Sequence, residues 1–166
     1  MQRVQPDPDP GGGVLTVARK TVIDADYGKG IDLLEGADGT DQLVHSKGVR
    51  LDLPGFTWIM LSVVVALDAD MRPVGEGDIR AQTRFVLEQI RDDLERQGAS
   101  IDDICRVRVY VVGLTPERFR AIHEERARFF RSEHYPASTL VEVAGLIKPE
   151  LMIEIDADAV ILGDGT

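Results

Sequence analysis

Residues 98–112 read GASIDDICRVRVYVV, and this stretch contains the change from helix to strand that decides the fold. Gly98 stands where a helix is commonly terminated, and a short polar junction over 100–103 follows it. From 104 to 112, apolar and polar side chains alternate with the period of a β-strand, which predicts a strand covered on one face. Its predicted faces are Val107, Val109 and Val111 on one side and Arg106, Arg108 and Tyr110 on the other.

Upstream of this stretch, the pattern predicts a helix preceded by strands. Asp78 is a good helix N-cap, and apolar residues recur at helical spacing from 79 to 94. Strands are predicted over 43–53 and 56–67, separated by the turn signal Pro54-Gly55, and a further strand lies within 14–24. The segment 56–67 is apolar on both faces, as expected of a central strand covered from two sides.

Downstream, Thr115-Pro116 predicts the start of a second helix, because a capping hydroxyl precedes a proline at the first helical position. The helical pattern runs to about Glu133, and Pro136 forbids its continuation. Strands are predicted over 139–146 and 151–162. Helices placed between such strands favour an α+β fold, a mixed β-sheet with two helices packed on one face. The other face of the sheet must then be exposed to solvent or covered by a partner, and the apolar strand at 56–67 favours a partner subunit.

Length and composition limit the classes of protein. A chain of 166 residues suits one domain, which we place at 14–162, and residues 1–13, rich in proline and glycine, are expected to be a disordered or draped tail. The formal net charge of −10 disfavours nucleic acid and membrane surfaces as partners. Cys105 is the only cysteine, which excludes an intrachain disulfide, and no apolar signal segment is present. We expect a cytoplasmic protein.

Several short motifs in order carry a resemblance to a known family. They are DIRAQT at 78–83, GASIDDI at 98–104, YPA at 135–137, VEVAGL at 141–146 and IEI at 153–155. At this spacing the chain resembles the RidA/YjgF family, which implies a chorismate-mutase-like α+β fold. Residues 14–43 are longer than the usual family N-terminus and form a divergent extension.

The resemblance implies a homotrimer that acts on a small molecule at clefts between subunits, without a cofactor. Typical members hydrolyse reactive enamines and imines to keto acids and ammonia. This chemistry needs a group that orients water, a proton source for the departing amine and a clamp for the substrate carboxylate. Glu154 aligns with the family's glutamate on the last strand, which is proposed to position the water.

The other family positions differ in this chain. The family's Pro-Ala-Arg reads Pro136-Ala137-Ser138, and serine cannot form the paired charge-assisted hydrogen bonds of a guanidinium. Other pocket positions also differ from the family pattern. Leu140 replaces a cysteine found in many members, His123 replaces an asparagine, His45-Ser46 replaces a Tyr-Ser pair and Ser62-Val63-Val64 replaces Ser-Gly-Gln.

Each candidate also has a simpler interpretation. Glu154 alternates with Asp156 and Asp158, so it can belong to a solvated acidic sheet face. His123 can be an ordinary surface residue of its helix. Arg126 lies one helical turn from His123 and can replace the missing clamp or pair with a neighbouring glutamate. The histidines lie on different elements without the spacing of a metal motif, so we predict no metal site.

The leading hypothesis is a RidA-like hydrolase that deaminates an enamine, an imine or a related small unsaturated metabolite, with Glu154 and His123 as catalytic residues. The predicted substrate-binding residues are Ser138, Arg126, His45, Ser62 and Leu140. Two alternatives stay open: a pathway-specific enzyme of different chemistry acting on a cyclic or aromatic small molecule on the same trimer, and a non-catalytic trimer that binds or senses a small molecule.

Overall fold

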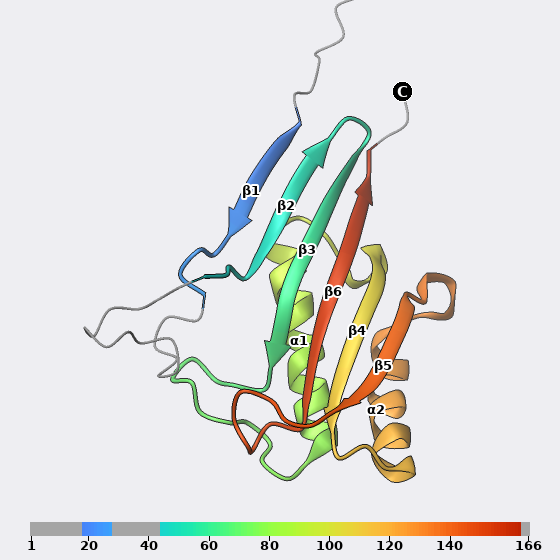
Figure 1. The fold of residues 1–166 in the computed structure, drawn as a ribbon. Helices are drawn as coiled ribbons and strands as arrows, with labels where there is room; N and C mark the ends of the chain where they lie inside the picture. Colours follow the sequence, from blue (N-terminus) through green and yellow to red (C-terminus); the bar gives the residue numbers. More distant parts are fainter. Residues whose placement is uncertain (1–17, 28–43, 164–166) are drawn as a thin grey trace, which may run out of the picture.

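The computed structural model describes residues 18–27 and 44–163, which form a six-stranded sheet with two α-helices (Figure 1). The strand order is β1-β2-β3-β6-β4-β5, and neighbouring strands are antiparallel except for the parallel pair β4 and β5. The elements are β1 (Arg19–Ile23), β2 (Gly48–Leu53), β3 (Phe56–Val65), α1 (Ile79–Arg96), β4 (Ile104–Val112), α2 (Pro116–Phe129), β5 (Ala137–Val143) and β6 (Ile153–Leu162).

The predicted helix starts are confirmed in atomic detail. The Asp78 carboxylate accepts hydrogen bonds from the backbone N–H groups of Arg80 and Ala81, which caps α1. Gly98 has a positive φ of 76°, so it ends the α1 segment in a backbone conformation that glycine adopts without strain. Thr115 caps α2 through its hydroxyl, which accepts from the Arg118 N–H.

The second helix is shorter than predicted. It ends at Phe129 instead of near Glu133, because Phe130 takes an extended backbone conformation and turns its ring into the core, where it is 7% exposed. A short 3₁₀ turn over Ser132–His134 then leads to β5. The gain from burying an aromatic ring there outweighs another turn of helix at an exposed surface.

Strand boundaries also move by a few residues. β2 begins at Gly48, later than the predicted start at 43, which itself lies outside the described residues. Lys47, just before β2, still bonds to the segments on both sides, because its N–H donates to the Asp24 carbonyl after β1 and its carbonyl accepts from the Ser62 N–H of β3. β5 covers 137–143 where 139–146 was predicted, and β6 starts at 153.

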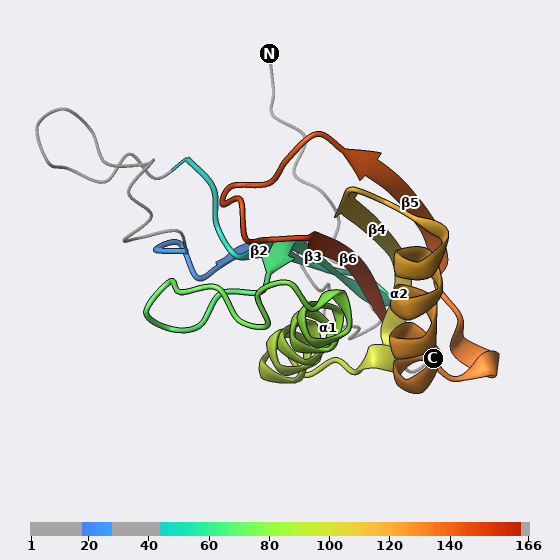
Figure 2. The ribbon, with the colours of Figure 1, turned by 90° about the horizontal axis from the view of Figure 1, so that it is seen from below.

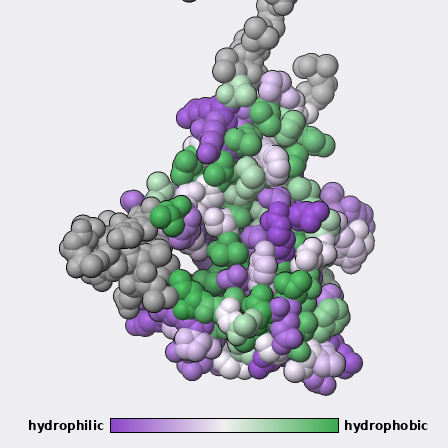
Figure 3. Space-filling view, viewed as in Figure 1, coloured by the Kyte–Doolittle hydropathy of each residue, from purple (hydrophilic) through white to green (hydrophobic). Residues whose placement is uncertain are grey.

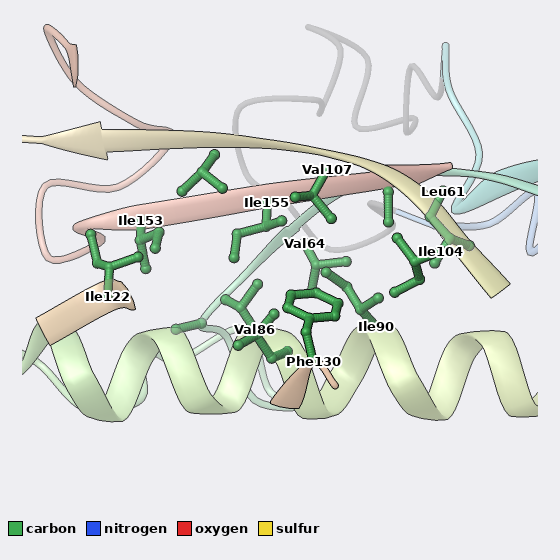
Figure 4. Packing of buried hydrophobic residues seen from close by; sticks show 14 of the residues in the cluster. Leu61, Val64, Val86, Ile90, Ile104, Val107, Ile122, Phe130, Ile153 and Ile155 are labelled. Carbon is green, nitrogen blue, oxygen red and sulfur yellow. The ribbon is translucent and has the colours of Figure 1, made fainter. Parts of the chain in front are cut away.

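Both helices pack on one face of the sheet, as predicted (Figure 2). The buried side chains between the helices and the sheet come from alternate positions of the three central strands and from the inner face of α1, with Ile122 of α2 and Phe130 completing the cluster (Figure 4). Val107, Val109 and Val111 of β4 are at most 1% exposed and lie on this side. The alternation in β4 that predicted a strand therefore also predicted which side faces the core.

The opposite face of the sheet, seen in Figure 3, mixes hydrophobic and hydrophilic side chains. Trp58 lies on it, 37% exposed, and pairs across β2 and β3 with Leu51. Arg108 and Asp156 lie on the same side. We call this surface the open face.

Part of the predicted N-terminal extension belongs to the sheet. Arg19–Ile23 forms β1, which pairs antiparallel with β2 and so lengthens the sheet by one strand. The predicted tail at 1–13 and the segment 28–43 lie outside the described residues. Within the part of the chain that the structure describes, neither helix is long and apolar enough to cross a membrane.

Candidate functional site

Two cavities contain most of the predicted site residues. One lies between α2 and β5, has a volume of about 380 Å³, and is called here the α2–β5 cavity. The other has a volume of about 680 Å³ and lies where β3 is irregular, between Leu61 and Val64, so we call it the β3-bulge cavity. Both volumes fall within the range of small-molecule sites.

The α2–β5 cavity brings together four predicted residues. They are His123 and Arg126 from α2, and Ser138 and Leu140 from β5. Arg126 donates a hydrogen bond from its guanidinium to Ser138 Oγ over 2.7 Å, so a helix arginine reaches the position where the family pattern has a strand arginine. Burial lowers the pKa of Arg126, and no described carboxylate acts against this shift.

His123 is held in one ring orientation on the cavity wall. Its Nδ1 lies 3.0 Å from the Phe119 carbonyl oxygen, and its ring stacks on the Phe119 ring with 4.0 Å between centroids. Because a carbonyl oxygen only accepts, Nδ1 carries the hydrogen in this contact. In the neutral imidazole, Nε2 is then the basic nitrogen that is available to a ligand.

The β3-bulge cavity contains Glu154 and His45. Tyr27 fixes this region, because its hydroxyl donates to the Val63 carbonyl at the bulge over 3.1 Å and its ring contacts His45 edge-on at 5.8 Å between centroids. Burial is the main cause that raises the pKa of Tyr27 to about 12, with the Asp93 carboxylate next in importance. Tyr27 therefore stays protonated and donates at neutral pH.

Glu154 differs from the other acids of its strand. Asp156 and Asp158 are 9% and 8% exposed and both pair with Arg108, Asp158 over 2.8 Å. The predicted alternative of a solvated acidic face therefore does not describe β6. Glu154 is half-buried without such a partner among the described residues, and its pKa is raised, first by burial and then by the Asp156 charge.

The two cavities are separated within the single chain. Glu154 pairs with Tyr110 of β4 and points to the open face, whereas Ser138 pairs with Val107 and points to the helix side. Strand β4 lies between them. One chain therefore does not bring Glu154 and His123 to the same reacting atoms.

Ser62 lines neither cavity. Its hydroxyl donates to the Ser46 carbonyl over 2.7 Å, so it ties β3 to the segment before β2. The neighbouring Val63 and Val64, which replace the Gly-Gln of the family pattern, do line the β3-bulge cavity.

Sequence reasoning assigned no role to Tyr27, Lys47, Phe119 and Tyr135, which line the two cavities. Tyr27 sits in a loop-like segment without a motif, so no local pattern indicates it. Tyr135 was part of the YPA motif that supported the fold, and its proximity to the pocket residue Ser138 was the available signal. The described residues hold no group of three His, Cys, Asp or Glu side chains arranged to bind a metal ion.

Comparison with known proteins relates this geometry to a family. The sequence model of the family described as Endoribonuclease L-PSP matches residues 55–161, which is more than half of the chain. A RutC family protein of Pyrococcus abyssi is 34% identical over 102 residues, covering 61% of this chain and 77% of the relative.

Solved structures agree with this match. A member of the YjgF/YER057c/UK114 family from Mycobacterium tuberculosis superimposes with a TM-score of 0.62 and 30% identity, covering 86% of this chain and 100% of that structure. TdcF from E. coli, solved with bound serine, has a TM-score of 0.58 and 27% identity, covering 71% and 88% of the two chains. The matched region includes both helices, the four strands β3 to β6 and Glu154, and on this evidence the chain belongs to the RidA/YjgF family.

Proposed function

We propose that this protein hydrolyses a reactive enamine, imine or related small unsaturated metabolite, and that it does so as a cytoplasmic homotrimer with the site between subunits. The observation that carries the proposal is the state of Glu154. It is the acid of β6 that faces a cavity without an arginine partner among the described residues, and its pKa is raised by burial. A carboxylate whose pKa is shifted toward neutrality is a better general base than an ordinary glutamate.

The proposed reaction balances without a cofactor. Water adds through oxygen to the carbon of the C=N bond, one of its protons passes to the Glu154 carboxylate, and the imine nitrogen takes up a proton. In the resulting carbinolamine the amino group takes up a proton, the C–N bond breaks to release ammonia, and the hydroxyl group loses its proton as the carbonyl group forms. An enamine enters the same sequence after a proton is added to its carbon.

His123 fits the second proton transfer. Its Nδ1 contacts the Phe119 carbonyl, so Nε2 is the ring nitrogen left to exchange a proton. An imidazole exchanges protons near neutral pH, so it suits a departing amine. We assign it the role of proton donor to nitrogen.

The separation of the cavities supports placing the site between subunits. Because Glu154 and His123 lie on different faces of the sheet and on either side of β4, a site that uses both needs the Glu154 of one subunit and the His123 of another. TdcF is described with bound serine, a small amino acid, which supports a small metabolite as the substrate of this chain also.

The test is ammonia release from an enamine generated in solution by a dehydratase. Glu154→Gln keeps the size of the side chain and removes its basicity, so we expect the enzymatic rate to fall by about 100-fold or more. Glu76→Gln is the matched control, since Glu76 is exposed and lines neither cavity. If the wild-type protein and Glu154→Gln leave the lifetime of the imine equally unchanged, the proposal is wrong.

The family description favours RNA cleavage as a second candidate. The formal net charge of −10 opposes it, because an acidic protein repels the phosphate backbone. The two candidates are separated by incubating the protein with single-stranded RNA at low salt. Cleavage that persists after repeated purification and disappears in Glu154→Gln would favour the nuclease.

A further inference from the structure

Gln82 is a buried amide of α1 whose hydrogen bonds reach outside its own helix. Its side chain is 0% exposed. Its Nε2 donates to the Glu150 carbonyl over 2.9 Å, and its Oε1 accepts from the Met152 N–H over 2.8 Å. Both partners lie near the end of the segment 144–152 between β5 and β6, called here the β5–β6 loop. One side chain therefore fixes the backbone on both sides of Leu151, directly before β6 begins.

The buried amide does more than fill space. An apolar side chain of the same size would pack without losing hydration, and two satisfied hydrogen bonds recover that loss with little net gain. What the amide adds is direction, because a hydrogen bond holds its partners within a narrow range of distance and angle. Thr83, the next residue and also 0% exposed, donates to the Ile79 carbonyl over 2.6 Å, so its hydrogen bond stays within α1.

The backbone that Gln82 holds leads directly to Glu154. Glu154 lies two residues after Met152 and pairs with Val65, the last residue of β3. The ladder between β3 and β6 ends at this pair, so β3 does not guide the residues before Glu154. Those residues are held by Gln82 from α1 and by β4, since the Val112 N–H donates to the Met152 carbonyl over 2.9 Å. Gln82 is thus one of two anchors for the backbone that precedes Glu154.

The β5–β6 loop also forms part of the wall of the β3-bulge cavity. Ile147 of this loop lines the cavity together with Glu154. Lys148 donates from its ammonium group to the Met71 carbonyl over 2.7 Å, which ties the loop to the segment before α1. A displacement of the loop would therefore move both a residue of the cavity wall and the backbone that carries Glu154.

We propose that Gln82 is a positioning residue for Glu154, and that its two hydrogen bonds to the β5–β6 loop hold the Glu154 carboxylate at the wall of the β3-bulge cavity. Gln82 lines neither cavity, so it acts through the backbone and not by contact with a ligand. The catalytic meaning of this assignment rests on the proposed hydrolase. The placement of the carboxylate is a property of the folded chain, and it can be measured without turnover.

The pKa of Glu154 reports where its carboxylate lies, because burial is the main cause that raises it and the Asp156 charge is the second. A carboxylate that moves outward regains water, and its pKa falls toward that of an ordinary glutamate. Among the described residues, the other ionisable groups around it are Asp156 and Tyr110 on the sheet and Asp24, Asp26, Tyr27, His45, Lys47 and Asp68 at the cavity. Substitutions at Gln82 change none of these groups.

The test is an NMR titration of the Glu154 carboxyl carbon in the full chain, with its signal assigned by its absence in Glu154→Gln. Gln82→Met keeps the length of the side chain and removes both hydrogen bonds, so we expect the pKa of Glu154 to fall toward the ordinary value. Thr83→Val is the matched control, since it removes a buried hydrogen bond that stays within α1. It should lower the urea midpoint of unfolding and leave the pKa of Glu154 at its wild-type value.

A shorter amide serves if Gln82→Met fails to fold. Gln82→Asn lacks one methylene and cannot span both partners, so it should move the pKa of Glu154 in the same direction by a smaller amount. An unchanged pKa in a folded Gln82 variant, with stability lowered as in Thr83→Val, would show that Gln82 only stabilises the fold. A shift of equal size in Thr83→Val would assign the effect to α1 as a whole. Either result would overturn the proposal.

Turnover separates this inference from the proposed reaction. If both hold, kcat per folded molecule should fall about tenfold or more in Gln82→Met and stay near the wild-type value in Thr83→Val. A lowered pKa of Glu154 in Gln82→Met, without imine hydrolysis by the wild type, would retain the positioning role and reject the hydrolase. Hydrolysis that depends on Glu154, with the pKa of Glu154 and kcat unchanged in Gln82→Met, would retain the hydrolase and reject the role of Gln82.

Discussion

Glu154 and Asp156 point to the same face of β6, yet only Asp156 is paired with an arginine. Arg108 reaches Asp156 and Asp158 and leaves Glu154, which lies nearer the N-terminal end of the strand, beyond its contacts. Three acids at alternate positions of one strand therefore divide into a structural pair and one carboxylate that faces a cavity.

Glu154→Gln should raise the stability of the protein at pH 7 relative to the wild type. The pKa of Glu154 is raised in the folded state, so its contribution to stability is present below the unfolded pKa and is lost as the pH rises through the folded pKa. A neutral glutamine does not suffer this loss. Urea unfolding of both proteins should show a difference that grows from about pH 4 to pH 7. A difference that is constant over this range would contradict the raised pKa.

The rate of imine hydrolysis should rise with pH as Glu154 loses its proton. Since burial raises the pKa of Glu154, the midpoint of this rise should lie above that of an ordinary glutamate, which is about 4.3. The measurement is the rate at limiting substrate concentration against pH, corrected for the uncatalysed reaction. A profile with no acidic limb above that value would exclude Glu154 as the base.

Arg108→Gln should destabilise the fold much more than Arg106→Gln. Both arginines lie on β4, but Arg108 neutralises two buried aspartates, whereas Arg106 is exposed and pairs with no carboxylate in the described structure. We expect a loss of about 1–3 kcal/mol for Arg108→Gln, given that the arginine is partly exposed, and less than about 0.5 kcal/mol for Arg106→Gln. Equal unfolding midpoints in urea would show that the Arg108 network contributes no stability.

Glu125 and Glu124, two neighbouring acids of α2, provide a second matched comparison of a buried and an exposed charge. Glu125 is 3% exposed and is contacted by Arg80, Arg84 and Arg128, whereas Glu124 is largely exposed and pairs only with Arg80. Glu125→Ala leaves these arginines without their shared partner between α1 and α2, so it should cost about 1–3 kcal/mol, and Glu124→Ala less than about 1 kcal/mol. Thermal unfolding followed by circular dichroism distinguishes the two. A larger loss for Glu124→Ala would mean that the buried carboxylate is not what joins the helices.

Trp58 provides a direct measure of whether the open face is covered. It is the only tryptophan of the chain and lies on that face, partly exposed in one subunit. If subunits pack through this face, dilution below the dissociation constant of the oligomer should shift the Trp58 emission to longer wavelength as water reaches the indole ring. Light scattering over the same dilution series gives the mass. An emission maximum that stays constant while the mass falls would place the subunit contact elsewhere.

The sequence predicted the order and type of the elements because the local signals were strong and agreed with one another. Asp78 and Thr115 have the chemistry of helix caps, and the alternation in β4 records its buried and open sides. The sequence predicted the end of α2 less well. Phe130 turns into the core because there is space for its ring between α2 and the sheet, and no local sequence pattern indicates that space.

The site was predicted only in part, for the same physical reason. His123, Arg126, Ser138 and Leu140 were each singled out, and the structure places them in one cavity. The hydrogen bond from Arg126 to Ser138 joins a helix to a strand twelve residues later in the chain, and neither residue alone indicates it. Tyr27 could not be found, since its contact with Val63 requires the bulge in β3.

The position of β6 between β3 and β4 has a consequence for how the chain folds. β6 is the last strand of the sheet in sequence, yet it occupies an inner place and pairs on both sides. During synthesis, β3 and β4 have no shared partner until β6 leaves the ribosome, so the core closes only at that stage. Because β6 carries Glu154, a chain interrupted before β6 lacks both the strand that completes the sheet and the carboxylate that we propose as the base.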